Sequence, residues 1–281
     1  MMIFKARGRE IDFNTVRIMG ILNITPDSFS DGGLFIESDK ALNHALKMIN
    51  EGADIIDIGG ESTRPGAVKI TAGQETARVV PVIKALRAAD ANAFISIDTY
   101  KAATAYEAIK AGADIINDIS GGTFEPEIMK IAARAQAGFI IMHINGTPDK
   151  MQENPVYSPA GVIHDIKDYF RERINSALAA GLKKENLMLD PGIGFGKTLK
   201  DNFEIIDKLK EFKEFGLPLL IGTSRKSMIG KVLGLDADKR LFGTAASVAL
   251  CAAKGADMLR VHDVKEMKET ALMTRAMSDY K

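Results

Sequence analysis

The chain of 281 residues has a single cysteine, only four histidines and no net charge, with 37 basic and 37 acidic side chains. Cys251 alone can form neither an intrachain disulfide nor a multi-thiolate metal site, and the scattered histidines do not indicate a zinc cluster. General nucleic-acid binders carry an excess of basic residues, because they displace counterions from phosphates. These absences argue against a disulfide-bonded protein, a zinc protein and a general nucleic-acid binder.

Long apolar runs are also missing. Met1–Arg9 lacks the apolar core of a signal peptide. The longest apolar run, Ala245–Ala253, is interrupted by Ser247 and is far shorter than the roughly 20 residues that span a bilayer. No lysine-rich tail or basic amphipathic helix points to a membrane surface. We therefore expect a soluble, cytoplasmic protein without membrane or nucleic-acid partners.

Short β-type runs alternate along the whole chain with longer segments in which apolar residues recur at helical spacing. The eight predicted strands are Ile18–Thr25, Ile55–Glu61, Phe94–Thr99, Ile115–Ser120, Phe139–Ile144, Leu187–Pro191, Leu219–Ser224 and Met258–Asp263. Helical spacing is clear in Lys40–Glu51, Gln74–Ala88, Ala102–Ala111 and Asn202–Phe215. Eight strands, each followed by a helix, predict a parallel (β/α)8 TIM barrel, a fold that uses about 250 residues as one domain.

The first 17 residues precede the barrel. Alternation in Ile3–Asn14 around Gly8 predicts a small β-hairpin over the barrel floor. We therefore expect residues 1–281 to form a single domain, of which 1–17 are a hairpin extension. A doubly wound open sheet is the alternative fold, but its Gly-x-Gly-x-x-Gly motif is absent after the first strand.

Every predicted strand ends in polar side chains, and a TIM barrel carries its chemistry at that rim. From the first strand to the eighth, these are Asn23; Asp57; Asp98 and Thr99; Asn117, Asp118 and Ser120; Met142, His143 and Asn145; Asp190; Thr223, Ser224, Arg225, Lys226 and Ser227; and Arg260, His262 and Asp263. The first two strands are followed by glycine-rich polar loops typical of lids and substrate loops.

The residue types indicate two kinds of ligand group. Carboxylates and a carboxamide at Asp98, Asn117 and Asp190 suit a heterocycle with alternating donors and acceptors. Arg260 and His262 are two positions apart and face the same way, which favours an anion site. Other residues could join them in holding phosphates or a phosphate-bound cation, namely Asn23, Thr63 and Arg64. Three rim aspartates are interpreted as helix caps or structural partners, namely Asp57, Asp118 and Asp263.

The ordered motifs resemble the dihydropteroate synthase family over about residues 18–270. They are ILNITPDSFSDGG at 21–33, DIGGESTRPG at 57–66, SIDT at 96–99, NDISG at 117–121, MH at 142–143, DPGIGFGK at 190–197, SRKS at 224–227 and RVHD at 260–263. The first two motifs together are highly specific. The chain departs slightly from the family in INGTPDKM at 144–151, where the family often has a basic residue near Asn145 or Asp149.

The resemblance implies a transferase of folate synthesis. Members join 6-hydroxymethyl-7,8-dihydropterin pyrophosphate to p-aminobenzoate and release pyrophosphate, through a cation conjugated with the pterin ring. Mg²⁺ is the implied cofactor, a homodimer the expected assembly, and sulfonamides the expected inhibitors.

The resemblance also implies roles for individual residues. The implied catalytic residues are Asp98, Lys226, Asp31 and Arg64. The pterin contacts are Asp98, Asn117, Met142, Asp190 and Lys226. The pyrophosphate contacts are Asn23, Thr63, Arg64, Arg260 and His262, with Asn23 reaching the metal ion. The p-aminobenzoate contacts are Phe29, Thr63, Pro65, Phe195, Lys226 and Ser227.

Two other functions stay open. A pterin-dependent methyltransferase would share the barrel and the Asp98, Asn117 and Asp190 contacts, but would have no use for Ser224-Arg225-Lys226 or the two loops. An inactive pterin-binding paralogue should have lost a loop or phosphate residue, and the motifs are complete. Release of pyrophosphate distinguishes all three.

Overall fold

The computed structural model describes residues 2–24, 34–62 and 67–280. Eight parallel strands form its main sheet, in the order β8-β7-β6-β5-β4-β3-β10-β9. Their bounds are β3 Arg17–Asn23, β4 Ile55–Gly59, β5 Phe94–Asp98, β6 Ile115–Asp118, β7 Gly138–Met142, β8 Leu187–Asp190, β9 Leu220–Ile221 and β10 Met258–Val261. A bridge between Leu189 and Leu219 joins the two ends of the sheet, so the predicted (β/α)8 barrel is confirmed.

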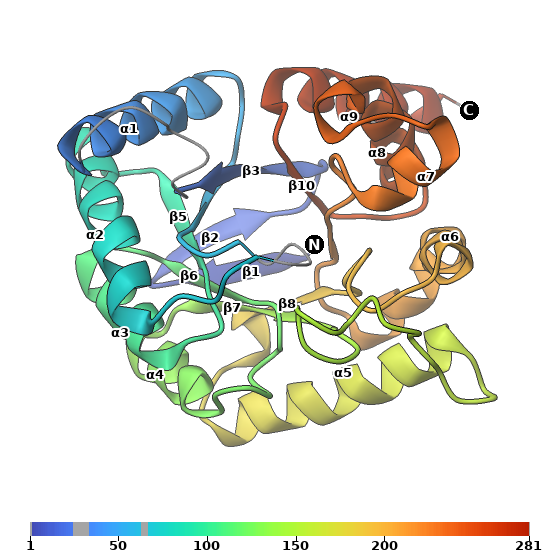
Figure 1. Ribbon diagram of the computed structural model, residues 1–281, viewed down its shortest axis with the longest axis horizontal. Helices are drawn as coiled ribbons and strands as arrows, with labels where there is room; N and C mark the ends of the chain where they lie inside the picture. The colour runs from blue at the N-terminus through green and yellow to red at the C-terminus, as the bar shows by residue number, and fades with distance from the viewer. Residues whose placement is uncertain (1, 25–33, 63–66, 281) are drawn as a thin grey trace.

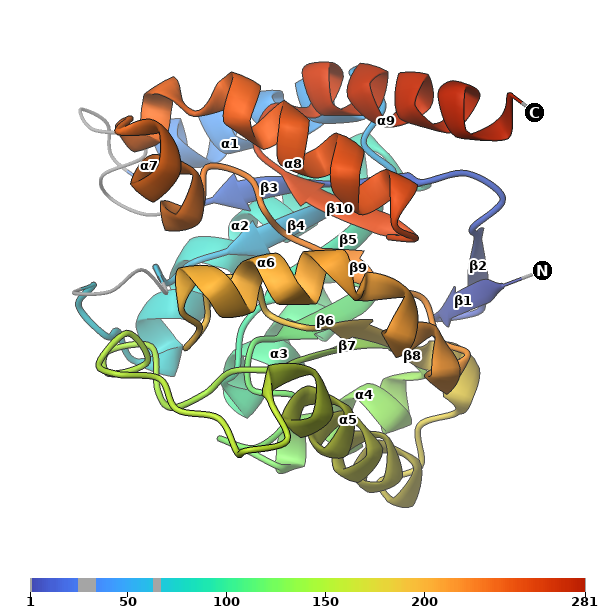
Figure 2. The same ribbon diagram turned by 90° about the vertical axis from the view of Figure 1, so that its right-hand side faces the viewer.

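The helices surround this sheet on its outer face (Figures 1 and 2). They are α1 Leu34–Asn50, α2 Ala72–Ala89, α3 Ala102–Ala111, α4 Glu127–Ala135, α5 Val162–Ala179, α6 Leu199–Asp207, α7 Ser227–Leu233, α8 Leu241–Ala253 and α9 Val264–Asp279. Three 3-10 segments lie between these elements, η2 Lys184–Asn186, η3 Leu209–Phe215 and η4 Ala237–Lys239. None of the helices in the described ranges is long and apolar enough to cross a membrane.

Two helix predictions were wrong. The segment Asn202–Phe215 is not one helix, because α6 ends at Asp207 and a 3-10 segment follows. Leu209 and Phe212 are both buried, and three residues per turn places them on the same side of that segment. In addition, β9 is followed by two α-helices, α7 and α8, where one was predicted.

Capping residues begin the helices that follow two of the rim loops. Thr71 Oγ1 accepts from the Gln74 backbone N–H at the start of α2, and Gln74 Oε1 accepts from the Thr71 N–H. Thr198 and Asp201 form the same reciprocal pair at the start of α6. These capping boxes satisfy otherwise unpaired donors of the first turn, and so define where each loop ends and each helix begins.

Side chains alternate along each strand between the helix layer and the barrel interior. On β4, Ile56 and Ile58 belong to the cluster shared with the helices, whereas Ile55 belongs to a separate interior cluster. Asp57 therefore faces the interior, one step above Ile55. The interior cluster is otherwise apolar and consists of Phe4, Ala6, Ile11, Met19, Ile55, Ile115, Ile140, Met188, Leu220 and Met258. The barrel interior is thus apolar near the amino ends of the strands and polar near the carboxyl ends.

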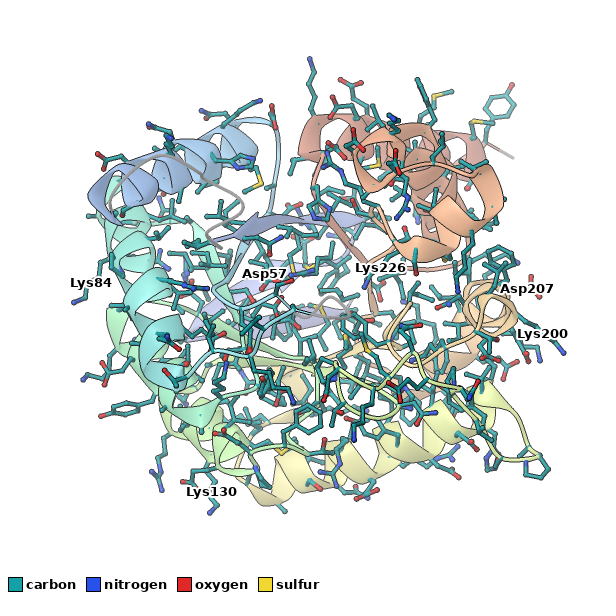
Figure 3. The ribbon with its side chains drawn as sticks, viewed as in Figure 1. Asp57, Lys84, Lys130, Lys200, Asp207 and Lys226 are labelled. Carbon is teal, nitrogen blue, oxygen red and sulfur yellow. The ribbon has the colours of Figure 1, made fainter. Side chains whose placement is uncertain are left out.

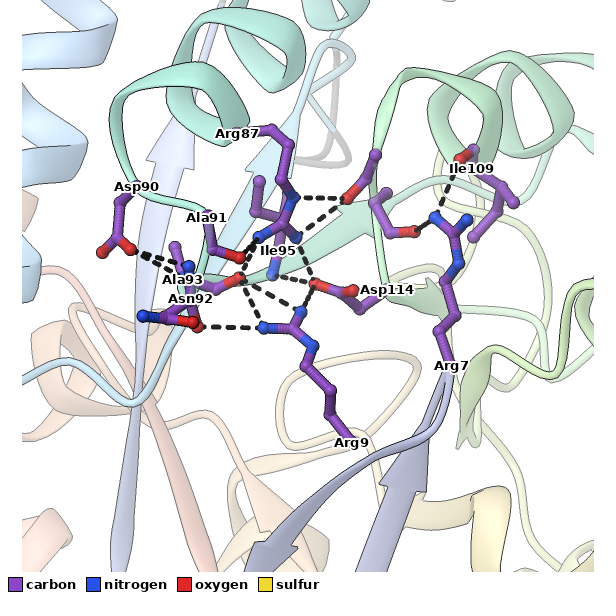
Figure 4. Close-up of polar contacts among 12 residues, drawn as sticks. Arg7, Arg9, Arg87, Asp90, Ala91, Asn92, Ala93, Ile95, Ile109 and Asp114 are labelled. Atoms are coloured by element: carbon purple, nitrogen blue, oxygen red, sulfur yellow. Dashed lines mark hydrogen bonds and ion pairs between the residues drawn. The ribbon is translucent and has the colours of Figure 1, made fainter.

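The predicted N-terminal hairpin is confirmed as β1, Ile3–Ala6, paired antiparallel with β2, Arg9–Asp12. Its Phe4 is fully buried in the interior cluster, so the hairpin closes the barrel floor. Figure 4 shows how its arginines are held. Arg7 Nη1 donates to the Ala113 carbonyl over 2.9 Å, and Arg9 forms an ion pair with Asp114. Arg87 Nη2 donates to the same carboxylate over 2.6 Å, which ties the hairpin to the α2 and β6 segments.

Candidate active site

A polar layer lies at the carboxyl end of the barrel. Asp98 and Asp190 are the last residues of β5 and β8, while Asn117 and Arg260 are next to last in β6 and β10. All four face the interior, because their neighbours on either side along the strands belong to the helix-facing layer or the connecting loops. The structure therefore brings together four of the predicted site residues at the carboxyl end of the barrel.

Arg260 is the centre of this layer. Its Nε donates to Asp57 Oδ2 over 2.6 Å, and its Nη2 donates to Asp98 Oδ2 over 2.7 Å. Burial acts to lower the pKa of Arg260, but the two carboxylates outweigh it and raise that pKa. The guanidinium thus stays charged and joins β10 to β4 and β5. The structure places Arg260 beside a predicted pterin residue, while its predicted pyrophosphate contact stays a prediction.

Asp57 was predicted to be a cap or structural partner, and it is a structural partner of the site itself. Its side chain is fully buried. Oδ2 accepts from Asn117 Nδ2 over 3.0 Å as well as from Arg260. Sequence reasoning left Asp57 out of the site. Its position two residues after the interior Ile55 was the signal that could have included it.

Two site carboxylates titrate near neutrality. Burial raises the pKa of Asp98 to about 7, against the attraction of Arg260, and Asp57 raises it further. Burial likewise raises the pKa of Asp190 to about 6, although the Gly192 N–H donates to its Oδ1 over 2.7 Å. Both groups can therefore gain or lose a proton near neutral pH.

An aromatic ring of the turn after β8 meets a cation of the loop after β9. Lys226 Nζ lies 4.0 Å from the centroid of the Phe195 ring, so two residues predicted for the p-aminobenzoate pocket are in contact. The turn comes very close to the end of β7. A Cβ on Gly192, where φ is +70°, would lie 2.0 Å from the His143 carbonyl oxygen. Only glycine fits that backbone, which explains the glycine at this position of the motif.

Lys197 supports this turn through a hydrogen bond to the Phe195 carbonyl. Sequence reasoning did not include Lys197 in the site. Its buried Nζ donates to the Phe195 carbonyl over 3.0 Å and lies 2.9 Å from His143 Nδ1. The His143 N–H in turn donates to the Asp190 carbonyl over 2.9 Å. Burial lowers the pKa of Lys197 to about 7, and burial together with Lys197 lowers the pKa of His143. Lys197 therefore connects the pocket wall at Phe195 with the strand end at Asp190.

An apolar cluster adjoins the polar layer. Met142, predicted to lie in the pterin pocket, is buried with Ile119, Ile144 and Met151, and Phe195 packs against them. A flat aromatic ring bound over the polar layer would meet this cluster. Met142 is the last residue of β7, lies two positions after the interior Ile140 and is in register with Asp190. This agrees with a pocket that is polar at its edge and apolar along one wall.

Asn23 ends β3, and Gly59 on β4 separates it from Asp98 on β5. A Cβ on Gly59 would lie 3.6 Å from both Asn23 Oδ1 and Asp98 Cβ. Within the described residues there is no group of three or more His, Cys, Asp or Glu side chains able to hold a metal ion. Mg²⁺ commonly binds one or two protein oxygens together with substrate phosphates and water. The single hard oxygen of Asn23 fits a Mg²⁺ ion that arrives with a phosphorylated substrate.

His262 and Ser227 lie at the same rim. His262 Nδ1 lies 2.9 Å from Ser224 Oγ, which comes from the loop after β9. Ser227 begins α7 directly after Lys226. The remaining predicted residues, Phe29, Asp31, Thr63, Arg64 and Pro65, lie outside the described residues.

The base of the second loop is firmly attached. Glu61 Oε1 accepts from the Ile70 N–H over 3.0 Å, which joins the two ends of the loop. Lys101 pairs with both Glu61 and the buried Glu75. Arg78 Nη1 donates to the Gly60 carbonyl over 2.8 Å. Sequence reasoning did not anticipate this network, because its members come from separate elements.

The other two rim aspartates are structural, as predicted. Asp118 accepts from the Ser120 N–H over 2.7 Å and from the Gly122 N–H over 2.8 Å. Asp263 pairs with Arg225 at the start of α9.

Comparisons with known proteins agree with this site. Residues 19–262 match the family of pterin binding enzymes. Dihydropteroate synthase of Escherichia coli is 46% identical over 271 residues, which cover 96% of this chain and 95% of that protein. The crystal structure of Yersinia pestis dihydropteroate synthase with a sulfonamide drug complex has a TM-score of 0.92 at 44% identity, covering 98% of this chain and 99% of that one. Xanthomonas albilineans dihydropteroate synthase with 4-aminobenzoic acid has a TM-score of 0.91 at 36% identity, covering 99% of both chains. The chain belongs to the pterin binding enzymes and, within them, to the dihydropteroate synthase family.

Proposed function

We propose that this transferase condenses 6-hydroxymethyl-7,8-dihydropterin pyrophosphate with p-aminobenzoate, giving 7,8-dihydropteroate and pyrophosphate. The observation that carries the proposal is the polar layer of Asp98, Asn117, Asp190 and Arg260, with the Lys226–Phe195 contact beside it. A ring rich in N–H donors suits the acceptors of that layer. Met142 and its apolar neighbours provide a wall for the ring face.

The reaction breaks the bond between the pterin methylene carbon and the pyrophosphate oxygen. The electron pair leaves with pyrophosphate, and the positive charge is shared between the methylene carbon and the ring. The ionised Asp98, held by Arg260, stabilises that charge. The amine nitrogen of p-aminobenzoate then forms a bond to the methylene carbon and loses a proton.

Pyrophosphate leaves more easily when its charge is neutralised. Asn23 would hold a Mg²⁺ ion on the pyrophosphate, and the ion would supply that neutralisation. Thr63, Arg64, Arg260 and His262 are the proposed protein contacts to the same oxygens. Arg260 can serve the leaving group through the part of its guanidinium that Asp57 and Asp98 do not engage.

The p-aminobenzoate pocket is proposed at Phe195, Lys226 and Ser227, completed by Phe29, Thr63 and Pro65 from the two loops. The cation at Lys226 suits the acid end of this substrate, and the Phe195 ring suits its aromatic face. The Xanthomonas relative is described with 4-aminobenzoic acid and the Yersinia relative with a sulfonamide, which supports a shared pocket for substrate and drug. A sulfonamide should therefore compete with p-aminobenzoate.

One assay tests the function. Pyrophosphate release is measured with both substrates and with each alone. Release that needs both substrates, with dihydropteroate formed in equal amount, is the expected result. Pterin binding without release would instead identify an inactive binding protein, and methyl transfer from a folate would identify the methyltransferase alternative.

A cytoplasmic homodimer is the assembly we propose. The helices α8 and α9 pack against each other. Their exposed large apolar side chains are Phe242, Leu250, Leu272, Met273 and Met277. Exposed apolar groups gathered on neighbouring helices are typical of interfaces. Sedimentation of the wild type and of Phe242→Glu tests the proposal, because the variant should sediment as a monomer.

A further inference from the structure

Asp57 is a fully buried carboxylate that the proposed reaction does not use. It lies on β4 in register with Ser96 on β5, below the polar layer. Figure 3 shows it inside the ring of helices. Its Oδ2 receives two hydrogen bonds, from Asn117 and from Arg260. Its Oδ1 has no hydrogen-bond partner among the described residues. Burying a carboxyl group lowers the stability of the fold unless its contacts compensate. The contacts of Asp57 therefore need an explanation.

The contact with Asn117 determines how that carboxamide is turned. A carboxamide has one donating and one accepting end, and its neighbours decide which way it faces. Oδ2 of Asp57, which is paired with the Arg260 guanidinium, acts as a hydrogen-bond acceptor. The Nδ2 end of Asn117 therefore faces Asp57, 3.0 Å away. The opposite orientation would place two oxygens against each other. The Oδ1 end of Asn117 is then the end available to a ligand.

Through its contact with Arg260, Asp57 also affects Asp98, a second predicted pterin contact. Asp57 holds Nε while Asp98 receives Nη2 of the same guanidinium. Without Asp57, the guanidinium would lose one of its two anchors. One oxygen of Asp57 thus positions side chains from β6 and β10, and through Arg260 it also affects Asp98 on β5.

We propose that Asp57 is a positioning residue that sets the hydrogen-bonding polarity of the pterin pocket, by turning the acceptor oxygen of Asn117 toward the exocyclic amine of the pterin. This proposal rests on the proposed function. With Asn117 so turned, the ring edge meets three acceptors, from Asp98, Asn117 and Asp190. Such an edge selects a ring that carries an amine over one that carries a carbonyl at the same position.

Two ligands read this polarity directly. 6-Hydroxymethylpterin carries the exocyclic amine, whereas 6-hydroxymethyllumazine carries a carbonyl there. Calorimetry gives the dissociation constant of each, and their ratio is the discrimination. Wild type should favour the pterin by at least about tenfold, since one mismatched hydrogen bond in a buried site has that effect.

Asp57→Ala should release the Asn117 carboxamide and lower the discrimination severalfold, to the part that Asp98 and Asp190 maintain. Asp57→Asn retains an oxygen that can accept from Asn117, so it should keep most of the discrimination while weakening the binding of both ligands. Ser96→Ala is the matched control, because it removes an equally buried polar group at the paired position. Ser96 Oγ has no hydrogen-bond partner among the described residues, so this variant should discriminate as the wild type does.

A double-mutant cycle separates positioning from general support of the fold. Asn117→Ala alone should lower the discrimination to the same extent as Asp57→Ala, and combining the two substitutions should change the ratio no further. If Asp57→Ala keeps the wild-type ratio of the two dissociation constants, even with weaker binding of both ligands, the proposal is overturned. If Asp57→Ala does not fold, loss of discrimination in Asp57→Asn to the extent seen in Asn117→Ala overturns it instead. Wild-type protein that binds neither ligand would contradict the proposed function rather than the role of Asp57.

Discussion

Arg260 Nη2 donates a hydrogen bond of 2.7 Å to Asp98 Oδ2, so the carboxylate proposed to stabilise the cationic pterin is itself held by a cation. The two residues are 162 positions apart in the sequence and meet inside the barrel. Burial alone favours the protonated form of Asp98, and Arg260 favours the ionised form. With the pKa of Asp98 at about 7, the balance between these effects decides how much of the enzyme is ready to react at neutral pH.

The first prediction is a pH profile. Because Asp98 must be ionised to stabilise the cation, kcat/KM should rise with pH through about 7. Arg260→Gln removes the charge that lowers the pKa of Asp98, so the rising limb should move to higher pH. The whole profile should also be lower, because Arg260 is a proposed pyrophosphate contact. If the rising limb of the kcat/KM profile stays at the same pH in the variant, the titration of another group controls that limb. Asp190, with its pKa of about 6, is the first candidate.

The second prediction concerns stability and pH, at a residue outside the ligand contacts. Burial raises the pKa of Asp118 to about 6, although the Ser120 and Gly122 N–H groups oppose the shift. A carboxyl group whose pKa is raised in the folded state stabilises the fold fully below its unfolded pKa. That contribution is lost as the pH rises through the folded pKa. Between pH 5 and 7.5, Asp118 should therefore remove on the order of 1 kcal/mol from the free energy of unfolding.

Asp118→Asn has no proton to lose over that range. Urea unfolding at pH 5 and at pH 7.5 gives the change in free energy for each protein. The change should be less unfavourable in the variant than in the wild type by about that amount. The same change in both proteins would mean that Asp118 is already ionised at pH 5.

The third prediction tests the turn after β8. Gly192→Ala should strongly destabilise the fold, because its Cβ would overlap the His143 carbonyl oxygen and φ is positive. Gly161→Ala is the control, since Gly161 also has a positive φ but no atom within 4 Å of the added Cβ. The loss of stability in Gly161→Ala should be limited to backbone strain, on the order of 1–3 kcal/mol. Thermal unfolding of the two variants compares their losses of stability. Equal losses would contradict the close approach of Gly192 to the His143 carbonyl.

The strands were predicted within a few residues because each combines a buried apolar run with polar residues at its end. Phe94–Thr99 and Leu187–Pro191 each extended only one residue past the strand. The segment Asn202–Phe215 was harder, because its apolar spacing fits a helix and a 3-10 turn equally well. Periodicity identifies a buried face, but it does not decide which hydrogen-bonding pattern the backbone uses.

The site was predicted unevenly for a similar reason. Residues that end strands, such as Asp190, can be placed at the rim from the sequence alone. Asp57, Lys197 and Lys101 act through partners that are distant in sequence, and local patterns carry no information on those contacts. Asp57 looked like an ordinary rim aspartate until its hydrogen bonds to Asn117 and Arg260 were seen.

The last prediction concerns Lys197. Its Nζ supports the Phe195 carbonyl, and the Phe195 ring faces Lys226, so Lys197 is a positioning residue for the p-aminobenzoate pocket. Lys197→Met keeps the length of the side chain and removes its hydrogen bonds. The variant should be less stable than the wild type, because the Phe195 carbonyl and His143 Nδ1 lose a buried hydrogen-bond donor. KM for p-aminobenzoate should rise about tenfold, as expected for loss of a charged hydrogen bond, and KM for the pterin substrate should change little.

The inhibition constant of a sulfonamide should rise in parallel in this variant, because the drug is proposed to use the same wall. Lys200→Met, an exposed lysine on the neighbouring helix α6, is the control and should leave all three constants unchanged. Steady-state kinetics with each substrate varied in turn gives the comparison. An equal rise in both KM values would place the effect of Lys197 on Asp190, through His143, rather than on Phe195. A rise for p-aminobenzoate without one for the sulfonamide would separate the two binding modes, because Phe195 would then be a contact of the substrate alone.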